Sequence, residues 1–240
     1  MSASRVAGGR GLVASALTSV ADWLVEPAPT AAPDATRDRP TVPRPVVAVA
    51  GLRRGAGVTT VARAVGAVLA GRDPAGACVV SCAGGLGSVP LGLPAAARLG
   101  RRIAPELAGR VRACGRLCLV QDAEPAALCA AARDLAPLVL DVADPAGAAA
   151  ASSLADLVVL VAGPDAEPAL AAVVAQSLAV VGPRPVLALN RCGRASGRWD
   201  AEPHVGVPES RLAAQLAGAG REPRGPVGEA VAALVDQEVA

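Results

Sequence analysis

The stretch VVAVAGLRRGAGVTTVARAVGAVLA, residues 46–70, determines the fold that we expect for this chain. Its first residues are a short apolar run rich in valine, which predicts a buried strand of a parallel sheet. Glycines follow at positions 51, 55 and 57, where the backbone has to turn tightly. Apolar residues then recur at helical spacing over 61–69. A strand, a glycine-rich turn and a helix in this order direct backbone N–H groups toward an anion, usually phosphate.

The glycine-rich turn matches part of the phosphate-binding P-loop pattern, G-x-x-x-x-G-K-[ST]. Gly57 takes the place of the second glycine, and Thr59 supplies the hydroxyl that would face Mg²⁺. The first glycine is displaced by one residue, to Gly51, and Val58 stands where the pattern has lysine. A strand–turn–helix connection that binds nothing would also explain this half-match, so the rest of the chain has to decide.

The composition predicts a cytoplasmic protein with one sizeable domain. A chain of 240 residues leaves room for that domain and for tails. All 23 basic residues are arginine, but the net charge of only +2 gives no overall signal of nucleic-acid binding. No apolar run reaches the ~18 residues that span a bilayer, so we expect no transmembrane segment.

The cysteines contain no C-x-x-C motif. Cys78 and Cys82 share a C-x₃-C spacing with Cys114 and Cys118, which leaves a zinc site open as an interpretation. Cys78 and Cys82 fall in an expected strand, however, and a buried cysteine acts as a small apolar residue. We therefore favour free thiols in a reducing cytosol, with no disulfide framework.

The sequence divides into three parts. Residues 1–26 are an N-terminal tail in which 11–26 can form an amphipathic helix. Residues 27–45 are rich in Pro and Ala and predict a partly extended linker. Residues 46–240 form the domain. Because the polar face of the tail helix carries no arginine, we expect it to dock on a partner protein or on the domain rather than on an anionic membrane.

The domain alternates strands and helices, which predicts an α/β fold: a doubly wound, mostly parallel sheet with helices on both faces. After the first strand and helix, apolar runs predict further strands at 77–82, 117–121, 138–142, 157–162, 186–189 and 204–207. Asp165 is expected to cap the helix that follows 157–162. We expect an irregular segment at 83–116.

This segment, 83–116, is rich in arginine and holds a single acid, Glu106. Its arginines are Arg98, Arg101, Arg102, Arg110, Arg112 and Arg116. They form either a solvated face or a patch that contacts the phosphates of DNA.

Polar residues fall where two of the expected strands end. Asp141 lies at the end of 138–142, and Asn190 with Arg191 follows 186–189. Ligands of such sheets bind at the carboxyl ends of the strands, so we expect these side chains near the P-loop. An acid at the position of Asp141 can hold Mg²⁺. The alternatives are a strand-end cap at Asp141 and a turn residue at Asn190.

These segments resemble the MinD/ParA-type ATPases, which belong to the SIMIBI class of P-loop proteins, over roughly residues 46–238. The resemblance rests on the P-loop, LVLDVADPAG (138–147), LVVLVAGPDAEPAL (157–170) and VLALNR (186–191). The downstream GVPESRL (206–212) resembles the loop of that family that lies beside the base. The deviant P-loop (Walker A) of that family, K-G-G-x-G-K-[ST], aligns with residues 53–59. The resemblance implies ATP or ADP with Mg²⁺ as the cofactor, and it places Thr59 and Asp141 at the metal. It implies nucleotide contacts from Arg53, Arg54, Gly55, Ala56, Gly57, Val58, Thr59, Thr60, Asn190 and Arg191.

Departures from the family weaken the expected chemistry. The family lysine that contacts the phosphates in cis is Val58 here, whereas the lysine that reaches across a dimer aligns with Arg53, which keeps the charge. The Asp-x-Asp that follows strand two in the family is missing, because 81–83 reads Ser-Cys-Ala. Each lost charge costs a phosphoryl-transfer site on the order of 10²-fold or more. We expect weak or absent nucleotide binding and almost no ATP hydrolysis.

The resemblance implies a nucleotide-binding switch or positioning factor for chromosome, septum or pilus machinery, in which Asn190 hydrogen-bonds the adenine. The alternative is a nucleotide-free pseudo-ATPase scaffold that keeps the fold and a dimer face. A metabolic P-loop enzyme of the dethiobiotin-synthetase kind would need the missing lysine. The expected partners are a second copy through the P-loop face, a protein bound by the N-terminal helix, and DNA at the arginine-rich segment.

Overall fold

The computed structural model describes residues 44–81, 94–103, 111–121, 124–143, 145–193, 197–199 and 204–236. The expected tail, 1–26, lies outside the described residues, as does the linker 27–45 except for its last two residues. Cys82, Glu106 and Arg110 also lie outside them.

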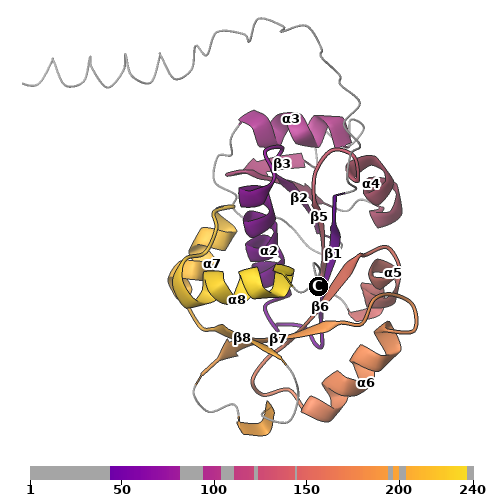
Figure 1. The fold of residues 1–240 in the computed structure, drawn as a ribbon, viewed down its shortest axis with the longest axis vertical. Coiled ribbons are helices and arrows are strands. Elements are labelled where there is room, and N and C mark those ends of the chain that lie inside the picture. The colour runs from indigo at the N-terminus through magenta and orange to yellow at the C-terminus, as the bar shows by residue number, and fades with distance from the viewer. Residues whose placement is uncertain are drawn as a thin grey trace, which may run out of the picture. The chain divides into compact units, whose positions relative to one another are not determined.

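The described strands form one sheet in the order β3-β4-β2-β5-β1-β6-β7-β8 (Figure 1). They are β1 (Val46–Gly51), β2 (Ala77–Ser81), β3 (Val111–Cys114), β4 (Leu117–Gln121), β5 (Leu138–Val142), β6 (Leu157–Ala162), β7 (Val186–Cys192) and β8 (Val205–Pro208). Neighbouring strands run parallel, except that β3 lies antiparallel to β4 at one edge. The expected mostly parallel sheet is confirmed.

Helices cover both faces of the sheet, which confirms the doubly wound arrangement (Figure 1). They are α2 (Val58–Arg72), α3 (Pro94–Ile103), α4 (Pro125–Ala132), α5 (Ala148–Ser152), α6 (Pro168–Leu178), α7 (Arg211–Gly218) and α8 (Gly225–Asp236). α2, α7 and α8 share one core with Val47 and Val49 of β1. α3, α4, α5 and α6 share the other core with Val46 and Ala48. Successive residues of a strand point to opposite faces, so β1 supplies both cores.

α2 lies tightly against the middle of the sheet. A Cβ on Gly66 would come within 2.7 Å of Val79 Cγ2 on β2, so no larger residue fits there without a shift. β1, β5 and β6 are buried along their whole lengths, as expected for central parallel strands covered on both faces. This packing places the start of α2 at the carboxyl ends of the central strands.

The expectation of an irregular segment at 83–116 is wrong for its described part, which contains α3 and the edge strand β3. α3 buries Ala96, Leu99 and Ile103, whereas its arginines are exposed. The helix was missed because arginines interrupt the apolar stripe. β3 was missed because a four-residue edge strand with one exposed arginine carries too little apolar pattern.

The expected cap at Asp165 is also wrong. α6 begins three residues later, at Pro168, with Glu167 at the N-cap position. Proline suits the first turn of a helix because its missing N–H would have no partner inside the helix. Asp165 instead forms an ion pair with Arg53 of the P-loop.

The described cysteines are free, and Cys78, Cys114, Cys118 and Cys129 are buried. Burial raises the pKa of the Cys114 and Cys129 thiols, which favours the neutral form. Within the described ranges, no three His, Cys, Asp or Glu side chains are grouped as a metal site would require. Among the same residues, no helix combines the length and apolar character needed to cross a membrane.

Candidate functional site

The loop of residues 51–57 joins β1 to α2 and is shaped by two glycines. Gly55 has φ +80° and Gly57 has φ +90°, a left-handed conformation that other residues adopt only under strain. Gly57 is the N-cap of α2, and its carbonyl accepts the Val61 N–H at 3.1 Å. No described side chain caps this helix. Its first N–H groups therefore remain available to an anion, and the helix dipole favours negative charge there.

Val58 occupies the lysine position of the P-loop pattern and points into the protein. It is only 4% exposed and belongs to the core between α2 and the sheet. Its Cγ2 lies 2.5 Å from the place where a Cβ on Gly51 would stand, so it packs directly over the end of β1. No positive charge therefore reaches the loop from this position.

Two consecutive side chains at the end of β7 bind the backbone of the loop. Asn190 Nδ2 donates a hydrogen bond to the Ala56 carbonyl at 2.8 Å, and this bond is buried. Arg191 Nη2 donates to the Gly55 carbonyl, also at 2.8 Å. The structure thus brings Asn190 and Arg191 to the P-loop, as the sequence predicted, but their described contacts are with the protein backbone.

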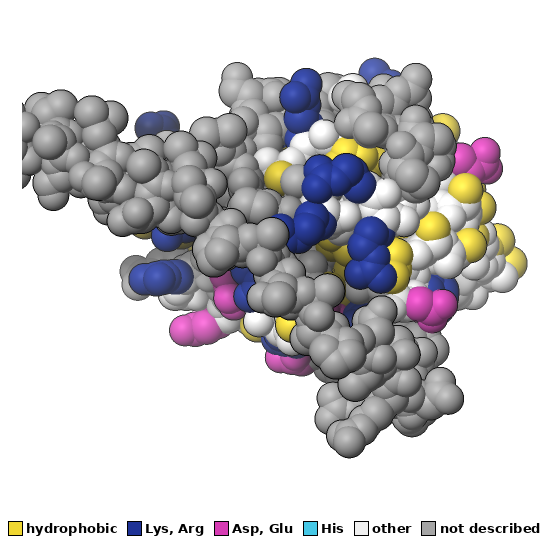
Figure 2. All heavy atoms as spheres, turned by 90° about the horizontal axis from the view of Figure 1, so that it is seen from above, with side chains coloured by type: hydrophobic (Ala, Val, Ile, Leu, Met, Phe, Trp, Pro, Cys, Tyr) yellow, Lys and Arg dark blue, Asp and Glu magenta, His cyan; other side chains and the backbone are white. Residues whose placement is uncertain are grey.

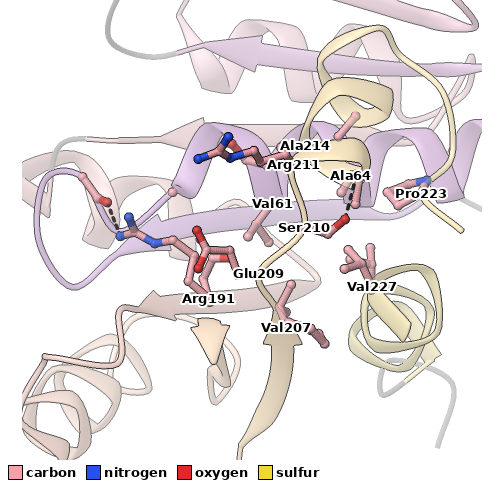
Figure 3. A pocket seen from close by; sticks show the side chains of 18 residues that line it. Val61, Ala64, Arg191, Val207, Glu209, Ser210, Arg211, Ala214, Pro223 and Val227 are labelled. Carbon is pink, nitrogen blue, oxygen red and sulfur yellow. Dashed lines mark hydrogen bonds between the residues drawn. The ribbon is translucent and has the colours of Figure 1, made fainter. Parts of the chain in front are cut away.

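A cavity of about 220 Å³ lies beside the loop, between α2, β8, α7 and α8 (Figure 3). Apolar side chains of Val61, Val207 and Val227 line its interior, while Arg191 and Glu209 lie on the side of the loop. Ligand pockets for drug-sized molecules usually span ~300–1,000 Å³. The cavity can therefore hold a ring or a base, and the phosphates of a nucleotide would lie outside it, on the loop.

Comparison with known proteins relates this geometry to solved structures. No protein-family model and no curated protein matches the chain. A ParA family ATPase from Chlorobium tepidum has a TM-score of 0.55 at 15% identity, over 82% of this chain and 99% of that one. The ATP complex of a McdA variant from Cyanothece has a TM-score of 0.55 at 16% identity, over 82% and 96%. The MinD cell division protein of Aquifex aeolicus has a TM-score of 0.54 at 16% identity, over 81% and 97%.

The chain has the ParA/MinD-type P-loop fold. At these identities the likeness establishes the fold alone. The roles of individual residues in this ParA/MinD-type fold have to be argued from their own contacts.

Thr59 and Asp141 come together beneath the start of α2. Asp141 is 1% exposed, and its Oδ1 atom is buried with no hydrogen-bond partner among the described residues. Burial raises the pKa of this carboxyl group, whereas a hydrogen bond with Thr59 and the charge of Arg63 lower it. A buried acceptor without a partner beside a hydroxyl fits a hard cation such as Mg²⁺, which binds one or two carboxylates and keeps several waters. The residue opposite Asp141 on β2 is Ser81, so the described strands supply no second acid beside it.

Arg53 and Arg54 lie on the exposed part of the loop. Arg53 forms an ion pair with Asp165 in the connection between β6 and α6, and both side chains are more than half exposed. The hydrogen bond that Arg53 donates within this ion pair is the main reason that the pKa of the Asp165 carboxyl group is lowered. Because both side chains are more than half exposed, water weakens the ion pair and Arg53 can leave it for another anion.

The sequence did not predict that residues of α7 and α8 line the cavity. Val227 and Val231 are separated from the P-loop by some 170 residues of chain, and no local motif marks them. The resemblance of 206–212 to a base-side loop was the available signal for Glu209, Ser210 and Arg211. Ser210 also caps α7, because its hydroxyl accepts the Ala213 N–H at 3.1 Å.

Proposed function

We propose that the chain is a ParA/MinD-like positioning factor that binds an adenine nucleotide weakly and hydrolyses it slowly or not at all. The main support for this proposal is the glycine-shaped loop at the start of α2, which no described side chain caps. Beneath it lie Thr59 and Asp141, whose Oδ1 atom has no hydrogen-bond partner among the described residues. The buried Val58 argues against efficient hydrolysis, because no charge replaces the lysine at that position. The role would be the placement of chromosome, septum or pilus machinery in the cytoplasm.

In this proposal the loop amides of 55–60 bind the phosphates of ATP or ADP, and the neighbouring cavity takes the base. Thr59 and Asp141 would hold Mg²⁺, which supplies positive charge beside the phosphates when it is bound. Arg53 would leave Asp165 and turn to phosphate, either in its own chain or across a homodimer formed through the P-loop face. The N-terminal helix expected at 11–26 would bind a protein partner.

A second candidate is a scaffold that binds no nucleotide. Its support is that the site is largely satisfied by the protein itself. Asn190 and Arg191 donate hydrogen bonds to carbonyl groups of the loop. The lysine position is taken by the buried Val58, and Arg53 forms an ion pair with Asp165. A scaffold would use the same fold and the same surfaces for its partners.

Calorimetric titration of ATP and ADP, with and without Mg²⁺, separates the two candidates. We expect micromolar or weaker dissociation constants, a tighter ATP complex with Mg²⁺, and almost no phosphate release. Asp141→Asn should remove the effect of Mg²⁺ while leaving weak ATP binding. Absence of binding under every condition would favour the scaffold, and turnover at the rate of an ordinary ATPase would refute slow hydrolysis.

The same variant has a signature in stability. Burial raises the pKa of the Asp141 carboxyl group in the folded state above its ordinary value of 3.8. The stability that the protonated Asp141 contributes is therefore fully present below pH 3.8, and it is lost as the pH rises through the pKa of the folded state. Asp141→Asn should therefore raise Tm at pH 7 without nucleotide, by about 2–4 °C per kcal/mol in a domain of this size. The gain should disappear near pH 3.

DNA is a further proposed partner, at a surface formed by α3 and the β3–β4 hairpin. Arg98, Arg101 and Arg102 are exposed on α3, and Arg112 is exposed on β3. The described residues of α3, β3 and β4 include no Asp or Glu. Figure 2 looks down on the α3 end of the molecule and shows basic side chains gathered there. Guanidinium groups suit phosphate because they can bind it through two parallel hydrogen bonds.

Replacing Arg98, Arg101 and Arg102 by alanine should weaken DNA binding and flatten its salt dependence. Each lost phosphate contact reduces the slope of log K against log salt by about 0.9, so the slope should fall by up to about 2.7. Fluorescence anisotropy with a short duplex measures it. The control replaces Arg72, Arg184 and Arg198, which are exposed elsewhere, and changes the net charge equally. An equal loss in the control, or no binding at low salt in the natural protein, would contradict this surface.

A further inference from the structure

We infer that Asn190 and Arg191 act as a latch that holds the P-loop in its anion-binding shape. In this inference the side-chain amide of Asn190 donates its hydrogen bond to the loop and not to a nucleotide base. The latch is defined by the two hydrogen bonds from these side chains to the loop carbonyls. The consequence for nucleotide affinity rests on the proposed function, whereas the latch itself is a property of the protein without ligand.

The backbone at Arg191 explains how both side chains reach the same loop. In a regular strand, consecutive side chains point to opposite faces of the sheet. Arg191 has φ +58° and is the one non-glycine residue with positive φ in the described part of the chain. The pairing of β7 with β8 also shifts register between Asn190 and Cys192. This local turn aims Arg191 at the loop already held by Asn190, and Figure 3 shows Arg191 reaching it.

The two hydrogen bonds also orient the loop amides. In a trans peptide unit, the C=O of one residue and the N–H of the next point in opposite directions. Because the Ala56 carbonyl faces Asn190, the N–H of Gly57 points away from Asn190, to the other side of the loop. An anion on that side meets an N–H group that is already aimed. A loop without its lysine depends more strongly on such preorganisation, since backbone groups supply most of the attraction that remains.

Both ends of the latch are anchored in the core. Leu52 at the start of the loop and Leu189 just before the latch belong to one buried cluster with Trp199. Asn190 itself is 7% exposed, and its Nδ2 atom overlaps the position that a Cβ on Gly57 would take. The amide group therefore sits on the loop in a fixed place, with its donor directed at backbone.

Binding of ATP and of inorganic tripolyphosphate separates a latch from a base reader. Tripolyphosphate carries the same phosphates without base or sugar. If Asn190 holds the loop, Asn190→Ala should weaken both ligands by the same factor, about tenfold for one lost buried hydrogen bond. If Asn190 reads adenine, Asn190→Ala should weaken ATP and leave tripolyphosphate unchanged, which would overturn the inference.

Hydrogen exchange of the loop amides tests the latch without any ligand. We expect faster exchange over 52–60 in Asn190→Ala and in Arg191→Gly, the second of which removes the side chain but tolerates positive φ. Arg211→Ala is the matched control, because Arg211 lines the same cavity from α7. Unchanged exchange in both variants would overturn the latch. Faster exchange in both, together with no ligand binding by the natural protein, would sustain the latch and reject the proposed function.

Discussion

Replacing Gly57 by alanine is expected to abolish binding of ATP, ADP and tripolyphosphate and to lower Tm by about 10 °C. Gly57 has φ +90°, where a side chain costs about 1–2 kcal/mol. The new Cβ would also overlap the Asn190 amide, and such overpacking adds about 1–3 kcal/mol. To relieve the overlap, either the loop or Asn190 has to move, and both movements break the bond to Ala56. Thermal unfolding and calorimetric titration measure the two effects.

Gly55→Ala is the matched control for this prediction. Gly55 has a similar φ of +80°, but nothing lies within 4 Å of the Cβ that alanine would add. Gly55→Ala should therefore lose only the free energy that a side chain costs at positive φ, about 1–2 kcal/mol, and its Tm should fall by about 2–8 °C. Equal losses in the two variants would show that contact with Asn190 contributes nothing. The double variant Gly57→Ala, Asn190→Ala should recover only the stability lost to the overlap with Asn190, and it should not recover anion binding.

Val58→Lys is expected to tighten ATP binding roughly 10- to 100-fold, the range of one charge-assisted hydrogen bond. The lysine stem would replace Val58 over Gly51 and carry the ammonium group to the loop, as long side chains do when they bury their methylenes. Hydrolysis should stay low, because the described strands place Ser81 and no second acid opposite Asp141. Calorimetry and a phosphate-release assay measure the two quantities.

The variant should also lose about 1–3 kcal/mol of stability, since the position is 4% exposed in a packed core. Val58→Met is the control, because it is long and flexible but uncharged. It should share the loss of stability without the gain in affinity. A gain in Val58→Met would assign the effect to packing. No binding in Val58→Lys, in a folded protein, would mean that the pocket is closed and would favour the scaffold.

Much of the fold could be predicted from the sequence because the decisive strands are central. β1, β5 and β6 are covered by helices on both sides, so their residues are apolar or glycine except for Asp141 near the carboxyl end of β5. Such runs are visible without any tertiary information. The glycines of the loop and the spacing of Val61, Val65 and Leu69 likewise follow from local backbone geometry.

Elements at the margin of the sheet were harder to predict. α3 buries one stripe of side chains and exposes three arginines, and β3 is a short edge strand with one face open. Their residues meet fewer constraints, so their pattern is weak. Asp165 was assigned to a helix cap by its place in the sequence, but Arg53 lies within reach across the loop and takes it as a partner.

The sequence by itself determined a doubly wound sheet, a glycine-shaped loop without lysine, and the polar residues that gather around it. Tertiary structure decided what those residues touch. Asn190 lies 134 positions from Ala56, and the cavity is closed by α7 and α8 from the far end of the chain. Contacts of this kind depend on how the helices pack on the sheet and on the positive φ angle of Arg191. Hydrophobic periodicity in the sequence predicts neither of them.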